Sequence, residues 1–151
     1  MTNRSKAKGT KFETQVCLWL RERLEDDRIE RRALHGSRDM GDLYGLFAHG
    51  WEGIVECKDY DSWADAELAK WQRQTEDERL NACADWALLV VHRKGCGAAR
   101  VGSNHAYLTI RSLLYLAGIR PQERPHDCVL DAYVELTLAK ACDLMTYEEE
   151  D

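Results

Sequence analysis

The hydrophobic residues near the start of the chain recur with a helical period. They are Phe12, Val16, Trp19, Leu20 and Leu24. Spacings of three and four residues place these side chains on one face of a helix. Thr10 precedes this stripe and Glu13 follows it three residues later, which is a capping-box pattern. The pattern predicts a helix from about Thr10, whereas residues 1–9 are polar and basic and are expected to be weakly ordered.

The middle of the chain alternates between short apolar runs and one longer helical pattern. Residues 29–34, 42–47 and 51–58 read as strands, and the last two form a hairpin if the chain turns at 48–50. Ser62 is expected to cap a helix that runs to about Ala82, with Leu68, Trp71 and Thr75 on its buried face. Residues 85–92 form the most apolar run, which is typical of a central strand buried on both faces.

The last third of the chain contains shorter elements. We expect strands beginning at 98–101 and spanning 107–110, and then a helix from about 111 to 117 that ends at Gly118. Pro121 and Pro125 indicate a linker, and residues 129–145 have the spacing of a final amphipathic helix before an acidic tail. The order of elements predicts one α/β domain with a mixed sheet, in which a meander leads through a crossover helix to a parallel strand.

Composition narrows the class of protein. The chain has 151 residues, 44% of them hydrophobic, and five tryptophans, which is enough for a single core. It has no apolar run of about eighteen residues, which a membrane helix needs. The basic amino terminus has no apolar segment of the kind that a secretory signal requires. We therefore expect a cytoplasmic protein whose six cysteines are reduced thiols.

The net charge of −6 is unevenly distributed. Residues 1–12 carry four basic residues and no acid, and residues 28–38 and 92–100 are also rich in arginine and lysine. Residues 121–151 hold nine acids and two bases. The basic stretches flank the central strands in sequence, so an acidic chain can still present a local surface for nucleic acid.

Candidate chemistry lies on the strand 51–58. Side chains alternate along a strand, so Glu56 and Lys58 share one face while Val55 and Cys57 share the other. Asp42 would join Glu56 and Lys58 if the two runs pair as a hairpin. Two carboxylates beside a lysine suit a divalent cation and a phosphate. Taken alone, the Glu56 and Lys58 pattern is usually that of a solvated ion pair, and Glu13 in the first turn of a helix is more often part of a capping box.

Three short segments taken together resemble the PD-(D/E)xK nuclease superfamily, and more narrowly the archaeal-type Holliday junction resolvases and their bacteriophage relatives. The segments are Lys8-Gly9-Thr10-Lys11-Phe12-Glu13, then Gly36-Ser37-Arg38 with Gly41-Asp42-Leu43, and Glu56-Cys57-Lys58. The resemblance covers about residues 8–92. Gly41 stands where the superfamily often has proline, and resolvase-like members commonly have glycine there.

The resemblance implies a restriction-endonuclease-like sheet and a Mg²⁺-dependent site, with Mn²⁺ as a substitute. Asp42, Glu56 and the Cys57 carbonyl would bind the metal, and Glu13 would bind it directly or through water. Lys58 would orient or deprotonate the attacking water, or stabilise the phosphorane. Ser37 would contact a phosphate. Flanking phosphates would be bound by basic residues, for which we take Lys8, Lys11, Arg31, Arg32, Arg38, Arg93 and Lys94.

The same resemblance implies a structure-selective endonuclease that cuts four-way DNA junctions as a homodimer, with no membrane and no small-molecule cofactor. The nuclease-like domain would span 1–120, and the linker, helix and tail of 121–151 would pack on it or on the dimer partner. Gln72 or Gln74 would line the site. Another nuclease of the superfamily (a nickase, a restriction-type enzyme or an exonuclease), a non-catalytic DNA-binding protein and a small interaction protein remain as alternatives.

Overall fold

The computed structural model of the chain describes residues 3–33, 38–124 and 128–148. Their elements follow in the order α1 (Asn3–Leu24), β1 (Glu30–Arg31), β2 (Leu43–Ala48), β3 (Trp51–Lys58), α2 (Asp65–Asn81), β4 (Trp86–Val91), η1 (Ala98–Ser103), β5 (His105–Thr109), α3 (Ile110–Leu116), η2 (Cys128–Asp131), β6 (Tyr133–Thr137) and α4 (Leu138–Thr146). Within these residues, no helix is both long enough and apolar enough to cross a membrane.

The strands form one sheet in which their spatial order equals their order in the sequence. All neighbouring strands are antiparallel except β3 and β4, which are parallel and are joined by α2. The hairpin of β2 and β3 and the parallel central strand β4 confirm the α/β prediction of a meander followed by a crossover helix. All six residues of β4 are buried, as its apolar run predicts.

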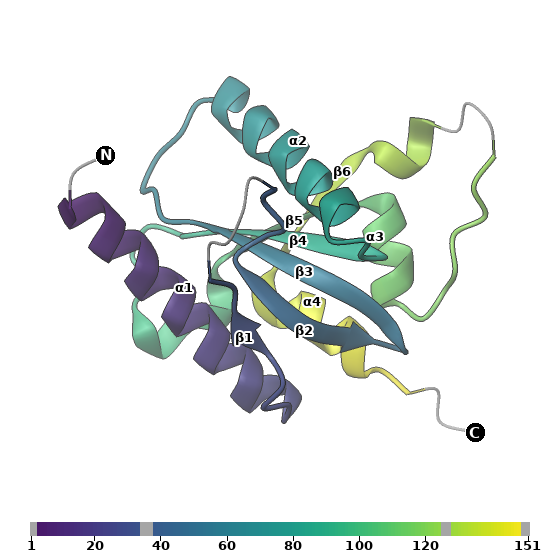
Figure 1. The fold of residues 1–151 in the computed structure, drawn as a ribbon, viewed down its shortest axis with the longest axis horizontal. Coiled ribbons are helices and arrows are strands. Elements are labelled where there is room, and N and C mark those ends of the chain that lie inside the picture. Colours follow the sequence, from purple (N-terminus) through teal and green to yellow (C-terminus); the bar gives the residue numbers. More distant parts are fainter. Residues whose placement is uncertain (1–2, 34–37, 125–127, 149–151) are drawn as a thin grey trace.

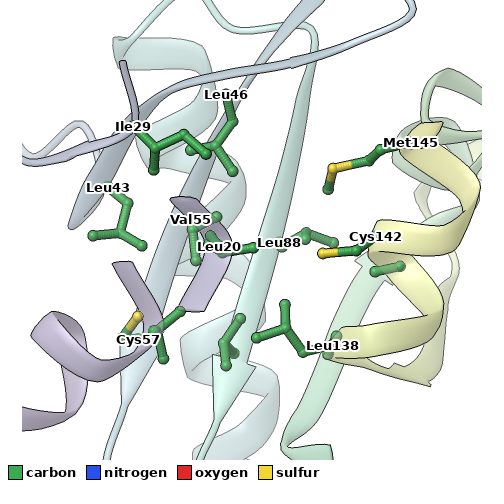
Figure 2. Close-up of a cluster of buried hydrophobic side chains, with 14 of the residues drawn as sticks. Leu20, Ile29, Leu43, Leu46, Val55, Cys57, Leu88, Leu138, Cys142 and Met145 are labelled. Carbon is green, nitrogen blue, oxygen red and sulfur yellow. The ribbon is translucent and has the colours of Figure 1, made fainter. Parts of the chain in front are cut away.

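Helices cover both faces of the sheet (Figure 1). On one face, α1 and α4 pack on a large core that includes Leu20, Val55, Leu88 and Leu138. Figure 2 shows this core, with Val55 beside Leu20 of α1, and Leu138, Cys142 and Met145 following one another along α4. On the other face, Trp71 of α2 packs against Leu89 and Val91 of β4. The two faces of β3 therefore meet different helices, and the face that carries Glu56 lies under α2.

The amino-terminal helix begins earlier than predicted. Helix α1 starts at Asn3, so Thr10 lies inside it, and neither the predicted start near Thr10 nor the weak order of residues 3–9 is correct. The backbone carbonyl of Thr10 accepts a hydrogen bond from the Thr14 hydroxyl, one turn later. Thr10 is therefore not an N-cap and Glu13 is not part of a capping box, which leaves the Glu13 carboxylate available to the side chains around it.

The carboxy-terminal half of the prediction requires the largest correction. Residues 133–137, predicted as helix, form β6 and pair with β5. Helix α4 begins only after Thr137, whose side chain accepts a hydrogen bond from the Lys140 backbone amide. The α4 residues Leu138 and Met145 are buried in the core of the same chain. The sheet therefore continues beyond residue 110 to β6, and α4 covers part of the hydrophobic core on one face of the sheet.

Three smaller predictions also differ from the structure. Residues 98–103 form the 3₁₀ helix η1 instead of the start of a strand. Strand β1 contains only two residues of the predicted run 29–34, part of which lies outside the described residues. Helix α2 starts at Asp65 with Ala64 at the N-cap, so Ser62 does not cap it.

Gly53 of β3 packs closely against the Trp86 side chain of β4, and a substitution there tests this packing. A Cβ atom at Gly53 would lie 2.1 Å from the indole of Trp86, a side chain that is fully buried. We expect Gly53→Ala to lower the free energy of unfolding by at least about 2 kcal/mol, because the core cannot accept the added methyl group.

Urea denaturation measures this change, and Gly9→Ala is the matched control. Gly9 lies within α1, and a methyl group added there would meet no atom within 4 Å outside the adjoining helix backbone. Alanine at this position should therefore stabilise the protein by about 0.5–1 kcal/mol. Equal stabilities of Gly53→Ala and the unmodified protein would contradict the packing described here.

Candidate functional site

Strand β3 places a carboxylate and an ammonium side by side. The Lys58 Nζ atom lies 3.4 Å from Oε1 of Glu56. The Glu56 side chain is 5% exposed and the Lys58 side chain 18% exposed. The predicted pairing is therefore correct, but the pair is not a solvated surface ion pair, since both groups are largely withdrawn from water.

Asp42 reaches the same place from the residue before β2. Its Oδ2 atom accepts a hydrogen bond of 2.8 Å from the Cys57 backbone amide, and its own amide donates to the Val55 carbonyl over 2.9 Å. Gly41 before it has φ +91°, and a Cβ there would press on Ile54 at 3.0 Å. Glycine at this position therefore allows the chain to turn close over β3 and present the Asp42 carboxylate.

Cys57 contributes to this arrangement through its backbone. Its side chain belongs to the core on the opposite face of the sheet, next to Val55 (Figure 2). Burial, first of all, raises the pKa of the Cys57 thiol well above its usual value, so the thiol stays protonated. The prediction that Cys57 supplies a carbonyl and not a thiolate is compatible with this orientation.

Glu13 approaches from α1. Its Oε2 atom accepts a hydrogen bond of 2.8 Å from Nη2 of Arg31, which belongs to β1. Its negative charge also contributes to the raised pKa of Asp42. Glu13 therefore lies within electrostatic reach of Asp42, while Arg31 holds its carboxylate in place.

Helix α2 adds a residue that was not among the predicted site residues. Glu78 is 1% exposed, and its Oε1 atom accepts a hydrogen bond of 2.9 Å from the Gln74 side-chain amide. Glu78 continues the stripe of Leu68, Trp71 and Thr75 at helical spacing. An acid on the apolar side of a helix was the signal in the sequence that could have identified it.

Gln74 therefore joins the site indirectly, through its hydrogen bond to Glu78, whereas the backbone of Gln72 contacts β6. The Gln72 backbone carbonyl accepts a hydrogen bond from the Tyr133 hydroxyl of β6. Of the two glutamines that the sequence left undecided, the structure brings Gln74 to the carboxylates.

Asp39 completes a cluster with Glu56 and Glu78. One carboxylate oxygen from each residue lies within 4.8 Å of the other two. Asp39 is exposed, and its Oδ1 atom accepts a hydrogen bond from the Gly41 amide. Its backbone carbonyl accepts another from the Asn81 side chain at the end of α2. The segment before β2 is thereby tied to α2 above Glu56.

Burial changes the proton affinity of these carboxyl groups. Loss of hydration, followed by the negative charge of Glu56, raises the pKa of Asp42 to about 8. Burial also raises the pKa of Glu78 to about 7. The pKa of Glu56 rises well above its usual value through burial and then through the adjacent Glu78 carboxyl group. Without a cation, the site holds protons at neutral pH.

The predicted DNA-binding residues fall into two groups. Lys8, Lys11, Arg38 and Lys94 are exposed. Arg31, Arg32 and Arg93 are engaged by the protein: Arg31 with Glu13, Arg32 over the Tyr44 ring at 4.8 Å, and Arg93 with the Ser103 carbonyl. Ser37, the predicted phosphate contact, lies outside the described residues.

A second cluster lies directly beyond Lys58. The Nδ1 atom of His92 is 3.3 Å from carboxylate oxygens of both Asp59 and Asp61, and Lys8 of α1 lies 3.7 Å from Asp59. The His92 amide also donates to the Lys58 carbonyl. These contacts tie the basic start of α1 to the end of β3 and β4, next to the carboxylates.

No family model, curated protein or solved structure matches this chain. The case for a function therefore rests on the geometry of the site and on the residue types that form it.

The donor set fits a divalent cation that prefers oxygen. Glu56 and Glu78 each keep one buried oxygen, Oε2, without a hydrogen-bond partner among the described residues. Buried acceptors of this kind are costly unless a proton or a cation satisfies them. Clustered carboxylates are the ligands of Mg²⁺ and Mn²⁺, and soft thiolate donors are not among them.

The raised pKa values predict that the cation-free protein loses stability as the pH rises. Asp42 ionises near 3.8 when unfolded and near about 8 when folded, so the folded state binds more protons between these values. Its stabilising contribution is complete below the unfolded pKa and is lost as the pH passes through the folded one. Asp42→Asn has no such titration, so its melting temperature should fall less than that of the unmodified protein from about pH 5 to about pH 9.

Thermal melting in EDTA tests this difference, which should reach several degrees at about 2–4 °C per kcal/mol for a chain of this size. Asp77→Asn, an exposed change on α2, is the control and should follow the unmodified protein. Parallel pH profiles for Asp42→Asn and the unmodified protein would show that Asp42 does not carry the shift.

Proposed function

We propose that this protein is a metal-dependent DNA endonuclease of the PD-(D/E)xK type. The observation that carries the proposal is the meeting of Asp42, Glu56 and Lys58 at one buried place, with Glu13 of α1 beside them. These are the four residues that the resemblance singles out, and they come from α1, from the residue before β2 and from β3. A chance motif would have no reason to converge in this way.

The arrangement of the elements supports the finer fold as well. A restriction-endonuclease-like core, as the resemblance implies it, needs a first helix, an antiparallel hairpin that carries the acidic residues, a crossover helix and a parallel strand. Helix α1, strands β2 and β3, helix α2 and strand β4 follow this order, and β3 pairs with β4 in parallel. Strands β5 and β6 extend the sheet beyond this core.

In the proposed hydrolysis, the side chains of the site would have separate roles. The carboxylates of Asp42 and Glu56, with the Cys57 carbonyl, would hold Mg²⁺, which supplies charge stabilisation to the phosphate and lowers the pKa of water. Lys58 is held at Glu56 by their ion pair, where its ammonium would orient the attacking water or stabilise the charge that develops on the phosphate oxygens. Glu13, fixed by Arg31, would accept a hydrogen bond from that water.

A surface for DNA lies along the start of α1. Arg4, Lys6, Lys8 and Lys11 are exposed there without an acid among them. The contact between Lys8 and Asp59 brings this stretch to the end of β3 that carries Lys58. Phosphates on either side of a scissile bond would therefore meet positive charge although the chain as a whole is acidic.

The resemblance points to branched DNA, and most specifically to four-way junctions, as the substrate. Such junctions are nearly two-fold symmetric and need two cuts, so the proposed enzyme acts as a C2 homodimer. Helix α4 is not a free surface for this dimer, since Leu138, Cys142 and Met145 are buried within the chain.

The assignment predicts the behaviour of Asp42→Asn on DNA. The change keeps the volume of the side chain but removes the charge that holds Mg²⁺, so cleavage of a labelled four-way junction should fall at least about a hundredfold, or roughly 2.7 kcal/mol. Binding of the junction in Ca²⁺ should persist. Asp77→Asn should cleave normally, and full cleavage by a pure Asp42→Asn preparation would exclude the proposed site.

The DNA surface predicts a change in salt dependence. Replacing both Lys8 and Lys11 with alanine should reduce the slope of log affinity against log salt by about two units, one for each lost phosphate contact. Arg120→Ala is the control, because Arg120 is exposed and lies away from α1. It follows Gly118, which lies beside His49 in the turn between β2 and β3, at the opposite end of β3 from Lys58. An unchanged slope in the double variant would move the DNA surface away from α1.

A further inference from the structure

The acidic residues around Glu56 exceed what one cation needs. Asp39, Asp42, Glu56, Glu78 and Glu13 come together with two cationic groups among the side chains described above, Lys58 and Arg31. Arg31 is engaged with Glu13 and Lys58 with Glu56. Asp39 and Glu78 therefore have no share in either ion pair, although Glu78 is fully buried.

Each member of the cluster Asp39, Glu56 and Glu78 is held from outside it. Glu56 is held by Lys58 at Oε1, Glu78 by Gln74 at Oε1, and Asp39 by the Gly41 amide at Oδ1. These contacts use one oxygen of each carboxylate. They orient the groups without neutralising the cluster, as supporting hydrogen bonds do around metal ligands.

The remaining oxygens of the two buried members receive no hydrogen bond from any other residue that the structure describes. These are Oε2 of Glu56 and Oε2 of Glu78, whose residues are 4% and 1% exposed. Two buried acceptors within an acidic cluster are costly unless a proton or a cation satisfies them. The exposed carboxylate of Asp39 at the edge of the cluster gives an ion from the solvent a way in.

We infer that Asp39, Glu56 and Glu78 form a second divalent-cation site, for an ion that prefers oxygen such as Mn²⁺ or Mg²⁺. One carboxylate oxygen from each lies within 4.8 Å of the others, a span that an ion with oxygen ligands at about 2.0–2.6 Å can bridge. Glu56 is common to this site and to the one proposed with Asp42, so its two oxygens serve two neighbouring ions. Paired ions of this kind lie about 3.5–4 Å apart.

The role of the second ion rests on the proposed function, whereas its binding does not. In a nuclease, an ion on the α2 side of Glu56 would balance charge on the departing oxygen while the ion at Asp42 serves the attacking one. Asp39 and Glu78 would then be ligands that belong to this chain's own loop and helix.

Counting bound Mn²⁺ by the electron paramagnetic resonance signal of the free ion tests the inference without DNA. The unmodified, cation-free chain should bind two Mn²⁺ ions. Glu78→Gln and Asp39→Asn should each bind one, with the affinity of the lost ion reduced at least about tenfold. Asp42→Asn should also bind one, and Glu56→Gln should lose both. Glu67→Gln makes the same change at an exposed position of α2 and should keep two.

The outcomes separate this inference from the proposed function. One ion that is lost in Asp42→Asn but kept in Glu78→Gln and Asp39→Asn would overturn the second site and leave the nuclease proposal intact. One ion with the opposite pattern would support the site at Asp39 and Glu78 and contradict the metal-binding role of Asp42. Because Asp39 is exposed in a loop, its variant keeps the test valid if Glu78→Gln does not fold.

Discussion

The parallel pairing of β3 with β4 is the constraint on which the site depends. Two parallel neighbours cannot be joined by a tight turn, so the chain must cross over the sheet, and it does so through α2. Glu56 pairs in register with Leu89, and Trp71 of α2 packs on Leu89 and Val91. The same packing that fixes α2 on the sheet carries Glu78 over Glu56, so the acidic cluster is a consequence of the crossover.

Burying these carboxyl groups works against stability, and the rest of the fold must compensate. A buried carboxylate without a partner is expensive, which is why burial raises the pKa values of Asp42 and Glu78. On the other face of the same strands, Val55 and Leu88 are completely buried in the core to which α1 and α4 contribute. An apolar core on one face thus offsets the cost of burying carboxyl groups on the other, and the alternation of side chains along β3 keeps the two apart.

The sequence predicted those parts of the site that local pattern determines. The strand 51–58 and the buried run 86–91 have strong β propensity, and Glu56 and Lys58 follow from alternation once the strand is known. Helical spacing with Leu68, Trp71 and Thr75 separates Glu78 from its neighbours Glu76 and Asp77, but only the packed structure brings it to Glu56. The spacing of residues 133–137 predicts a helix, whereas their strand conformation depends on pairing with β5, which is not a local property of the sequence. The local sign of the boundary is Thr137, which caps α4. The predicted start of α1 lies seven residues too late, near Thr10 instead of Asn3, because residues 3–9 lack the apolar stripe that indicates a helix.

The separation of charge in this chain would let an acidic protein approach DNA, as the proposed function requires. Apart from the exposed Asp39, the acids of the site are buried or paired with Arg31 and Lys58, so the exposed charge along the start of α1 comes from its basic residues. Lys8 lies close to Asp59, which also lies beside His92, and the His92 amide binds the Lys58 carbonyl. The basic helix and the lysine of the site are therefore parts of one connected arrangement. A phosphate attracted to α1 would already lie beside the carboxylates, which places electrostatic attraction and the proposed chemistry at the same end of β3.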